Sequence, residues 1–166
     1  TSKSMMFFAV GISGEAAMQD PQPLRDLLHR ALARYLTVTS RGFVIDGCVE
    51  PVPRIVVRIL GYGGARTLYQ HRRPACRSLD GVVAVTESGK RCDSCPQVDA
   101  CTPQVRVDLV VEGRPHRLML AFTSAKNFLA YVGTLEAQRV AVDAVRHELI
   151  VVQRRGWGEV QFREVR

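Results

Sequence analysis

Residues 105–122, VRVDLVVEGRPHRLMLAF, form two extended apolar runs joined by the turn segment 112–115, Glu-Gly-Arg-Pro. Apolar runs on either side of a short turn containing glycine and proline are typical of a β-hairpin. Leu118, Leu120 and Phe122 fall on one face of the second run, because side chains alternate across a strand. We therefore expect a hairpin that turns this face towards the core.

The segment before the cysteines also predicts strands. Residues 41–48 and 54–62 are β-branched runs, and residues 61–70 follow as a further strand. Turn-forming residues interrupt these runs at Gly47, Pro51, Pro53 and Gly61. The glycines of 61–64 lack the Gly-Lys-Ser/Thr ending of a phosphate-binding loop, so we interpret Gly61, Gly63 and Gly64 as a turn or a strand bulge.

The end of the chain predicts a second hairpin. Residues 147–165 contain two strand-like runs separated by 155–158, Arg-Gly-Trp-Gly. Val160 and Phe162 alternate with polar residues in the second run, which indicates a half-buried strand.

Two stretches have the spacing of amphipathic helices. Residues 24–35 carry apolar side chains three and four positions apart, after Asp20 and two prolines. Thr123 and Ser124 are expected to cap a second helix. Its apolar stripe is Phe128, Val132 and Leu135, with Lys126 and Gln138 in water. We also expect four aromatic residues in the core: Phe122, Phe128, Tyr131 and Phe162.

Several short strands with two helices predict an α+β fold rather than alternating βαβ units. A small OB-like β-barrel fits the number of strands, as do other small barrels. At 166 residues and 46% apolar content, we expect one domain over 1–166, with a metal-binding insertion at 76–101.

Composition narrows the class of partner. The net charge of +7 and the pI near 9.6 are typical of a protein that meets phosphates. The longest apolar run, residues 6–12, is shorter than the roughly 18 residues of a membrane span. Since no secretory signal is visible, we expect a cytoplasmic protein whose first residues, from Thr1, are a processing remnant.

Four of the five cysteines, Cys76, Cys92, Cys95 and Cys101, have the spacing C-x15-C-x2-C-x5-C. A Cys-x2-Cys pair aims two thiolates at one metal ion, and a second pair completes a tetrahedron, so we predict a zinc-ribbon-like site in which residues 81–86 form a small sheet. Four thiolates close the coordination shell, which makes the metal structural. Disulfides are disfavoured because a cytosol reduces them.

Two residues near this pattern have other interpretations. Cys48 stands apart and is expected to be a buried free thiol. His71 could replace a metal ligand, but as part of His71-Arg72-Arg73 it is expected on a basic surface.

An iron-sulfur cluster is the alternative to zinc, because four thiolates also hold a [4Fe-4S] cluster. The subpattern C-x2-C-P-x4-C resembles that of iron-sulfur nucleases of the CRISPR-adaptation and recombination-repair type. The Asp followed by Glu-x-Lys of those enzymes is not found, and the acidic residues are scattered. We therefore expect no enzymatic activity, with a relative of these iron-sulfur nucleases as the third hypothesis for function.

The second half of the chain resembles a family of phage and mobile-element proteins with a four-cysteine, zinc-ribbon-like motif. The resemblance rests on 76–81 (Cys-Arg-Ser-Leu-Asp-Gly), 89–96 (Gly-Lys-Arg-Cys-Asp-Ser-Cys-Pro), Cys101, and 123–128 (Thr-Ser-Ala-Lys-Asn-Phe) with Tyr131. It implies a zinc-containing single-stranded DNA-binding protein, similar to phage proteins that combine an OB barrel with a zinc site.

Single-stranded nucleic-acid binding needs cations along the backbone and exposed aromatic rings on which bases stack. The cationic candidates are Arg66, Arg72, Arg73, Arg77, Lys90, Arg91, Arg114, Arg117, Arg154 and Arg155. The stacking candidates are Tyr62, Tyr69 and Trp157. A second hypothesis is a metal-stapled module that docks onto replication, recombination or conjugation proteins through the helix at 24–35 and the apolar run at 5–12, with an oligomer possible.

Overall fold

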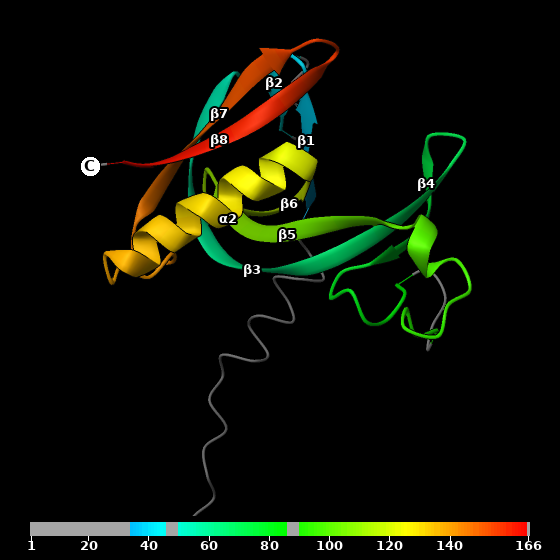
Figure 1. Ribbon diagram of the computed structural model, residues 1–166. Helices are drawn as coiled ribbons and strands as arrows, with labels where there is room; N and C mark the ends of the chain where they lie inside the picture. The colour runs from blue at the N-terminus through cyan, green and yellow to red at the C-terminus, as the bar shows by residue number, and fades with distance from the viewer. Residues whose placement is uncertain (1–33, 46–49, 86–89, 166) are drawn as a thin grey trace, which may run out of the picture.

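The structure is a computed structural model that describes residues 34–45, 50–85 and 90–165 (Figure 1). These residues form one sheet of eight strands and one α-helix, α2 (Phe122–Ala137). The strands are β1 (Arg34–Thr39), β2 (Gly42–Val44), β3 (Arg54–Gln70), β4 (Arg73–Ser78), β5 (Thr102–Val111), β6 (Arg114–Ala121), β7 (Arg146–Arg154) and β8 (Trp157–Val165). A short 3-10 helix, η1 (Val98–Ala100), precedes β5.

The strand order is β2-β1-β6-β5-β3-β7-β8, and β4 pairs with β3 outside this path. All pairs are antiparallel except β1 with β6, which is parallel. The central strand β3 has 17 residues. Along one edge it pairs with β5, and along the other its first half pairs with β7 and its second half with β4. The second half of β3 and its partner β4 therefore extend beyond the helix-covered part of the sheet (Figure 1).

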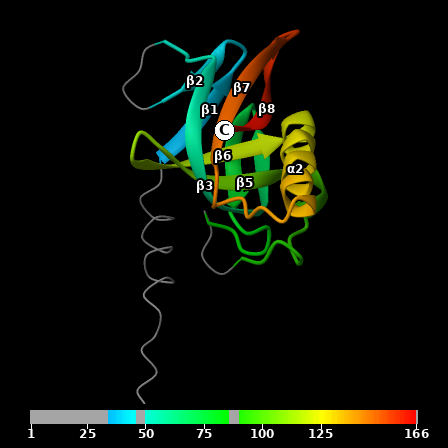
Figure 2. The ribbon, with the colours of Figure 1, turned by 90° about the vertical axis from the view of Figure 1, so that its left-hand side faces the viewer.

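The core lies between one face of the sheet and α2, which packs mainly on β8 and also on β5 and β6 (Figure 2). Alternation along the strands turns their apolar residues to this face. Phe128 of α2 is fully buried and meets the rings of Tyr62 and Phe162 edge-on, at centroid distances of 5.2 and 5.1 Å. The cluster around it includes Ile55, Val57, Ile59, Val107, Leu109, Val111, Leu118, Leu120, Val132, Leu149 and Val160.

The predicted barrel is wrong, because the sheet is open. It ends at β2 on one side and at β8 on the other, and no ladder joins these ends within the described residues. A barrel needs every strand to keep one consistent stagger around the closure. Here the two halves of β3 pair with different strands, so the sheet spreads apart at its β4 end.

The predicted number of helices is also wrong, since α2 is the one α-helix within the described residues. Residues 24–33 of the other expected helix lie outside the described part, as do residues 5–12 and Cys48. Tyr35, expected at the end of that helix, is in β1. The segment Arg34–Thr39 contains β-branched residues and pairs in parallel with β6, so sheet pairing overrides the helical spacing there.

The expected hairpins are confirmed. β5 and β6 are joined at Glu112 and Gly113, both with positive φ (49° and 78°), and β7 and β8 are joined at Arg155 and Gly156. The expected strand break at Gly61 is wrong, because β3 continues through it. The alternative interpretation as a bulge is confirmed, since the register with β5 shifts between Ile59 and Gly61.

The start of α2 differs from its prediction. Ser124 and Thr123 lie within the helix, whose start has no side-chain cap, and the Ser124 hydroxyl accepts a hydrogen bond from the Val160 amide at 3.0 Å instead. The stripe of Phe128, Val132 and Leu135 is buried as expected. Phe122 was expected in the core, but 74% of it is exposed. Its φ of 48° starts the helix in the left-handed region and turns the ring away from the core.

No helix in the described part of the chain is long and apolar enough to cross a membrane.

Gly158 of β8 provides a test of how far the sheet curls. A Cβ there would overlap the Thr39 carbonyl oxygen of β1 and lie 2.7 Å from Val151 Cγ1. We therefore expect Gly158→Ala to lower the free energy of unfolding by about 2–3 kcal/mol, because overpacked sites must shift their surroundings.

Gly133→Ala is the matched control. Gly133 lies in α2 with no atom near the added Cβ, so this change should raise the free energy of unfolding by about 0.5–1 kcal/mol. Urea denaturation measures both. Equal stabilities for the wild type and Gly158→Ala would contradict the close approach of β8 to β1.

Candidate functional site

The four predicted cysteine ligands come from three places in the fold. Cys76 lies on β4, opposite Leu68 of β3. Cys92 and Cys95 form a turn, in which the Cys95 amide donates to the Cys92 carbonyl at 3.2 Å. Cys101 follows η1, directly before β5, and its amide donates to the Val98 carbonyl at 3.1 Å. The β3–β4 hairpin and two tight turns therefore bring the four thiols to one end of the sheet.

The loop from β4 to the Cys92 turn starts at Asp80. The Asp80 carboxylate accepts hydrogen bonds from the amides of Val82 and Val83, at 2.8 and 2.9 Å, and from the Ser78 hydroxyl at 2.9 Å. The two backbone N–H groups are the main cause that lowers the pKa of Asp80 to about 2. The carboxylate thus holds the turn that leads into the cysteine loop.

The small sheet predicted for this loop consists of single bridges. Ala84 pairs with Ser78, and Val83 pairs with Arg91. The Cys92 amide also donates to the Val82 carbonyl at 2.7 Å. These contacts place the chain around Cys92 against the end of β4, next to Cys76.

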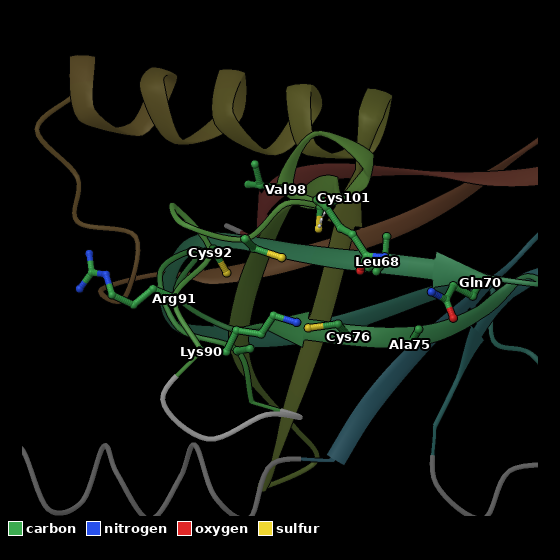
Figure 3. Close-up of a pocket in the computed structure, with 12 residues that line it drawn as sticks. Leu68, Gln70, Ala75, Cys76, Lys90, Arg91, Cys92, Val98 and Cys101 are labelled. Carbon is green, nitrogen blue, oxygen red and sulfur yellow. Dashed lines mark hydrogen bonds between the residues drawn. The ribbon is translucent and has the colours of Figure 1, made fainter.

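All four cysteines line one pocket of about 180 Å³ together with Lys90 and Arg91 (Figure 3). They are free thiols, and each is partly buried. In the close-up, the Lys90 amine points towards the side of the pocket that holds the Cys76 sulfur. No three acidic, histidine or cysteine side chains in the described residues are placed tightly enough to hold a metal ion as they stand. The cysteines share a pocket without forming a finished coordination shell.

The thiols also act on one another electrostatically. Burial is the main cause that raises the pKa of Cys101, and the neighbouring Cys95, Cys76 and Cys92 raise it further. Arg66 on β3 acts in the opposite direction. A cation placed among these sulfurs would favour their thiolate forms, because it offsets the repulsion between them.

Six of the predicted cationic residues lie at this end of the sheet, on β3, β4, the turn between them and the cysteine loop: Arg66, Arg72, Arg73, Arg77, Lys90 and Arg91. Arg72 and Arg73 are exposed at the tip of the β3–β4 hairpin, beside His71. Arg77 stacks over the Tyr35 ring at 4.9 Å, and Arg91 pairs with Asp93 at 2.6 Å. Tyr69, near the same tip, is 45% exposed.

The other predicted contacts lie elsewhere. Arg154, Arg155 and Trp157 are at the β7–β8 turn, beyond the opposite end of β3. For a strand of 17 residues, the two ends are separated by about 50 Å of chain. Tyr62 lies between them and packs on Phe128. Arg114 is exposed at the start of β6. The structure therefore does not bring the predicted nucleic-acid residues together in one place.

The sequence did not indicate a buried ion-pair cluster on the sheet face opposite the core. Asp108 pairs with Arg106 at 3.0 Å and with Arg117 at 3.1 Å, and both arginines are more than nine-tenths buried. Arg106 also donates to the Leu79 carbonyl, which ties the start of the cysteine loop to β5. Arg117 was a candidate phosphate contact, and its burial in this cluster removes it from that role. The sequence does contain a signal for this pair, because the predicted hairpin places Arg117 opposite Asp108. A count of charges does not include such cross-strand positions.

Comparisons of the chain with models of protein families, with curated proteins and with solved structures find no match.

The turn at Asp80 can be tested by amide hydrogen exchange. We expect Asp80→Ala to speed exchange of the Val82 and Val83 amides about fivefold at pH 7, because losing their acceptor costs about 1 kcal/mol of local stability in water. The pKa of Asp80 lies below its ordinary value, so this stabilisation is present above about pH 4 and is lost as the pH falls towards 2. The difference between variant and wild type should shrink over that window.

Asp93→Ala is the control in the same loop. Asp93 pairs with the exposed Arg91 side chain, whereas the Val82 and Val83 amides donate to Asp80, so loss of the Asp93 carboxylate should leave the exchange of these amides unchanged. Equal exchange rates in Asp80→Ala and wild type would show that the carboxylate does not hold this turn.

Proposed function

We propose that this protein binds single-stranded nucleic acid and that its four pocket cysteines hold a structural zinc ion. The observation that carries the proposal is the convergence of Cys76, Cys92, Cys95 and Cys101 on one pocket beside the arginines of the β3–β4 hairpin. The metal would fix the cysteine loop, and the hairpin would present its cations to a phosphate backbone.

The chemistry of the pocket fits zinc. Zinc prefers four thiolates in a tetrahedron at about 2.3 Å, so the loop has to draw its sulfurs inwards when the ion binds. Zinc with four thiolates carries two net negative charges, and Lys90 in the pocket wall and Arg66 beside Cys101 supply compensating charge. With all four positions filled by sulfur, the ion has no site for a reacting water and its role is structural.

The hairpin fits a phosphate backbone. Arg72 and Arg73 are exposed at its tip, and the exposed Tyr69 offers a ring next to them. His71 and Arg72 form the two-residue turn with positive φ values of 50° and 65°. Asparagine and glycine fill such turns at lower cost, so this turn sacrifices some stability to place the cation of Arg72 at the tip.

One observation favours a protein partner instead. The cysteine loop exposes Val82, Val83 and Val85 to 45, 38 and 61%, which is unusual for three neighbouring apolar residues. A metal-stapled module for replication or recombination proteins would use this surface. Salt dependence separates the two functions, because counterion release from phosphates gives a steep slope that an apolar interface lacks.

Metal analysis tests the zinc site. We expect about one zinc per chain after anaerobic purification, and chelation should lower the midpoint of thermal unfolding because the ion binds only the folded loop. Cys95→Ser should lose the zinc, whereas Cys48→Ser, which changes the cysteine outside the spaced set, should retain it.

Two results would contradict the zinc assignment. About four irons per chain with absorption near 400 nm would indicate a [4Fe-4S] cluster in the same pocket. Full stability and no bound metal after purification in zinc-containing medium would show that the cysteines hold no structural metal.

The hairpin is tested with the double variant Arg72→Gly and Arg73→Ala. Glycine accepts the φ of 65° at position 72, so the turn should keep its fold while losing two cations. We expect weaker binding to a fluorescent oligo-dT strand. The slope of log affinity against log salt should fall by about 0.7 for each lost phosphate contact.

Arg146→Ala is the matched control, because Arg146 is exposed at the start of β7, away from the hairpin. It should leave the affinity and the salt slope nearly unchanged. No binding by the wild type even at low salt, or equal slopes for all three proteins, would contradict nucleic-acid binding through this hairpin.

A further inference from the structure

A second groove, of about 480 Å³, shares no lining residue with the cysteine pocket. Its walls come from four elements: Val38 of β1, residues 119–124 where β6 passes into α2, and the start of β8. Two aromatic side chains line it, Phe122 and Trp157. No charged side chain is among the described residues that form it.

Both rings are exposed to solvent although the groove that they line is apolar. Phe122 is 74% exposed, more than any other large apolar residue in the described part of the chain, and Trp157 is 44% exposed. Leu120 and Val160, which also line the groove, are buried in the core. The two rings therefore stand above buried apolar residues, and part of each ring surface has no protein contact.

The stability of the fold does not explain the conformation of Phe122. A bulky residue with a φ of 48° is a backbone outlier, and this backbone aims the ring at solvent, where it gains no burial. Residues held in such conformations cluster at binding sites, because the surrounding structure maintains a strained geometry that a ligand uses.

Three exposed cations lie close in sequence to the segments that line the groove. Arg155 is exposed in the turn next to Trp157, and Lys126 is exposed on the first turns of α2. Arg41 is exposed two residues from Thr39, whose carbonyl abuts Gly158 in the groove wall. The acidic side chain nearest in sequence, Glu159, is buried and engaged by Arg154 at 2.7 Å and Asn127 at 3.0 Å. An apolar aromatic slot with a cationic border matches a ligand that is flat and apolar on its face and anionic at its edge.

We propose that this groove binds an unpaired nucleobase, with Phe122 and Trp157 as the stacking rings and the adjacent cations facing the phosphates. The proposal rests on the single-stranded nucleic-acid binding proposed above and adds a second contact region that the cysteine end does not contain. Stacking suits any base, since each has a π face, so the groove would bind without strong sequence preference.

Trp157 is the only tryptophan in the chain, so its fluorescence reports on the groove alone. The experiment titrates the full-length protein with oligo-dT while recording tryptophan emission, and in parallel follows the anisotropy of a labelled oligo-dT strand. We expect the emission to be quenched over the same concentration range in which the anisotropy rises.

Phe122→Gly tests the second ring. Glycine adopts a φ of 48° without strain, so the thermal midpoint should not fall, while the affinity for oligo-dT should drop about 5- to 100-fold, the contribution of one stacked base. Leu129→Ala removes an apolar side chain of α2 that is 51% exposed and does not line the groove, and it should bind like the wild type.

The outcomes separate the two proposals. Binding seen by anisotropy, with no change in tryptophan emission and with Phe122→Gly equal to wild type, overturns the groove and leaves nucleic-acid binding standing. In that case an apolar protein segment becomes the better candidate occupant. No anisotropy change in the wild type overturns nucleic-acid binding and the groove with it.

Discussion

The architecture depends on one constraint, the length of β3. Its 17 residues exceed what any neighbouring strand can pair, so one edge is shared between β7 and β4. The first half joins the helix-covered core, and the second half projects as the arm on which the cysteine loop is built. A bulge between Ile59 and Gly61 lets the strand continue through this transition, because the extra residue bends it and increases its twist. The cysteine pocket exists because β3 does not stop where the core stops.

Local features were predictable from the sequence, and long-range pairing was not. The hairpins at 112–115 and 155–158 are set by turn residues between alternating runs, and the cysteines are close in the chain, so short-range spacing was enough. The barrel prediction is wrong because closure depends on the register of strands that are far apart in the chain, and a single sequence does not reveal that register. The helix predicted at Tyr35 is wrong for a related reason, because the strand pairing of Tyr35 with Arg117 on β6 outweighs the helical spacing of the sequence.

The roles of individual side chains were harder to predict than the positions of strands and turns. Arg117 and Arg72 look alike in the sequence, but Arg117 is buried against Asp108 and Arg72 is exposed at a turn. The cluster of Arg106, Asp108 and Arg117 carries one net positive charge. The Leu79 carbonyl and the Tyr35 ring, which faces Arg117 at 6.0 Å, partly offset it. Charge counting therefore overstates the cationic surface, because part of the positive charge is used inside the fold to anchor the cysteine loop.

The two proposed contact regions differ in their backbone. Positive φ at a non-glycine residue is ordinary at the end of a helix, as at Arg139, and in a tight hairpin turn, as at Glu112, His71 and Arg72, but Phe122 has no such reason. The hairpin tip presents cations, and the groove presents aromatic rings. On one flexible strand, weak contacts at both regions reinforce each other, since the first raises the effective concentration of the second. That coupling requires a strand long enough to reach from the hairpin tip to the groove, so affinity should depend on the length of the oligonucleotide more than on its sequence.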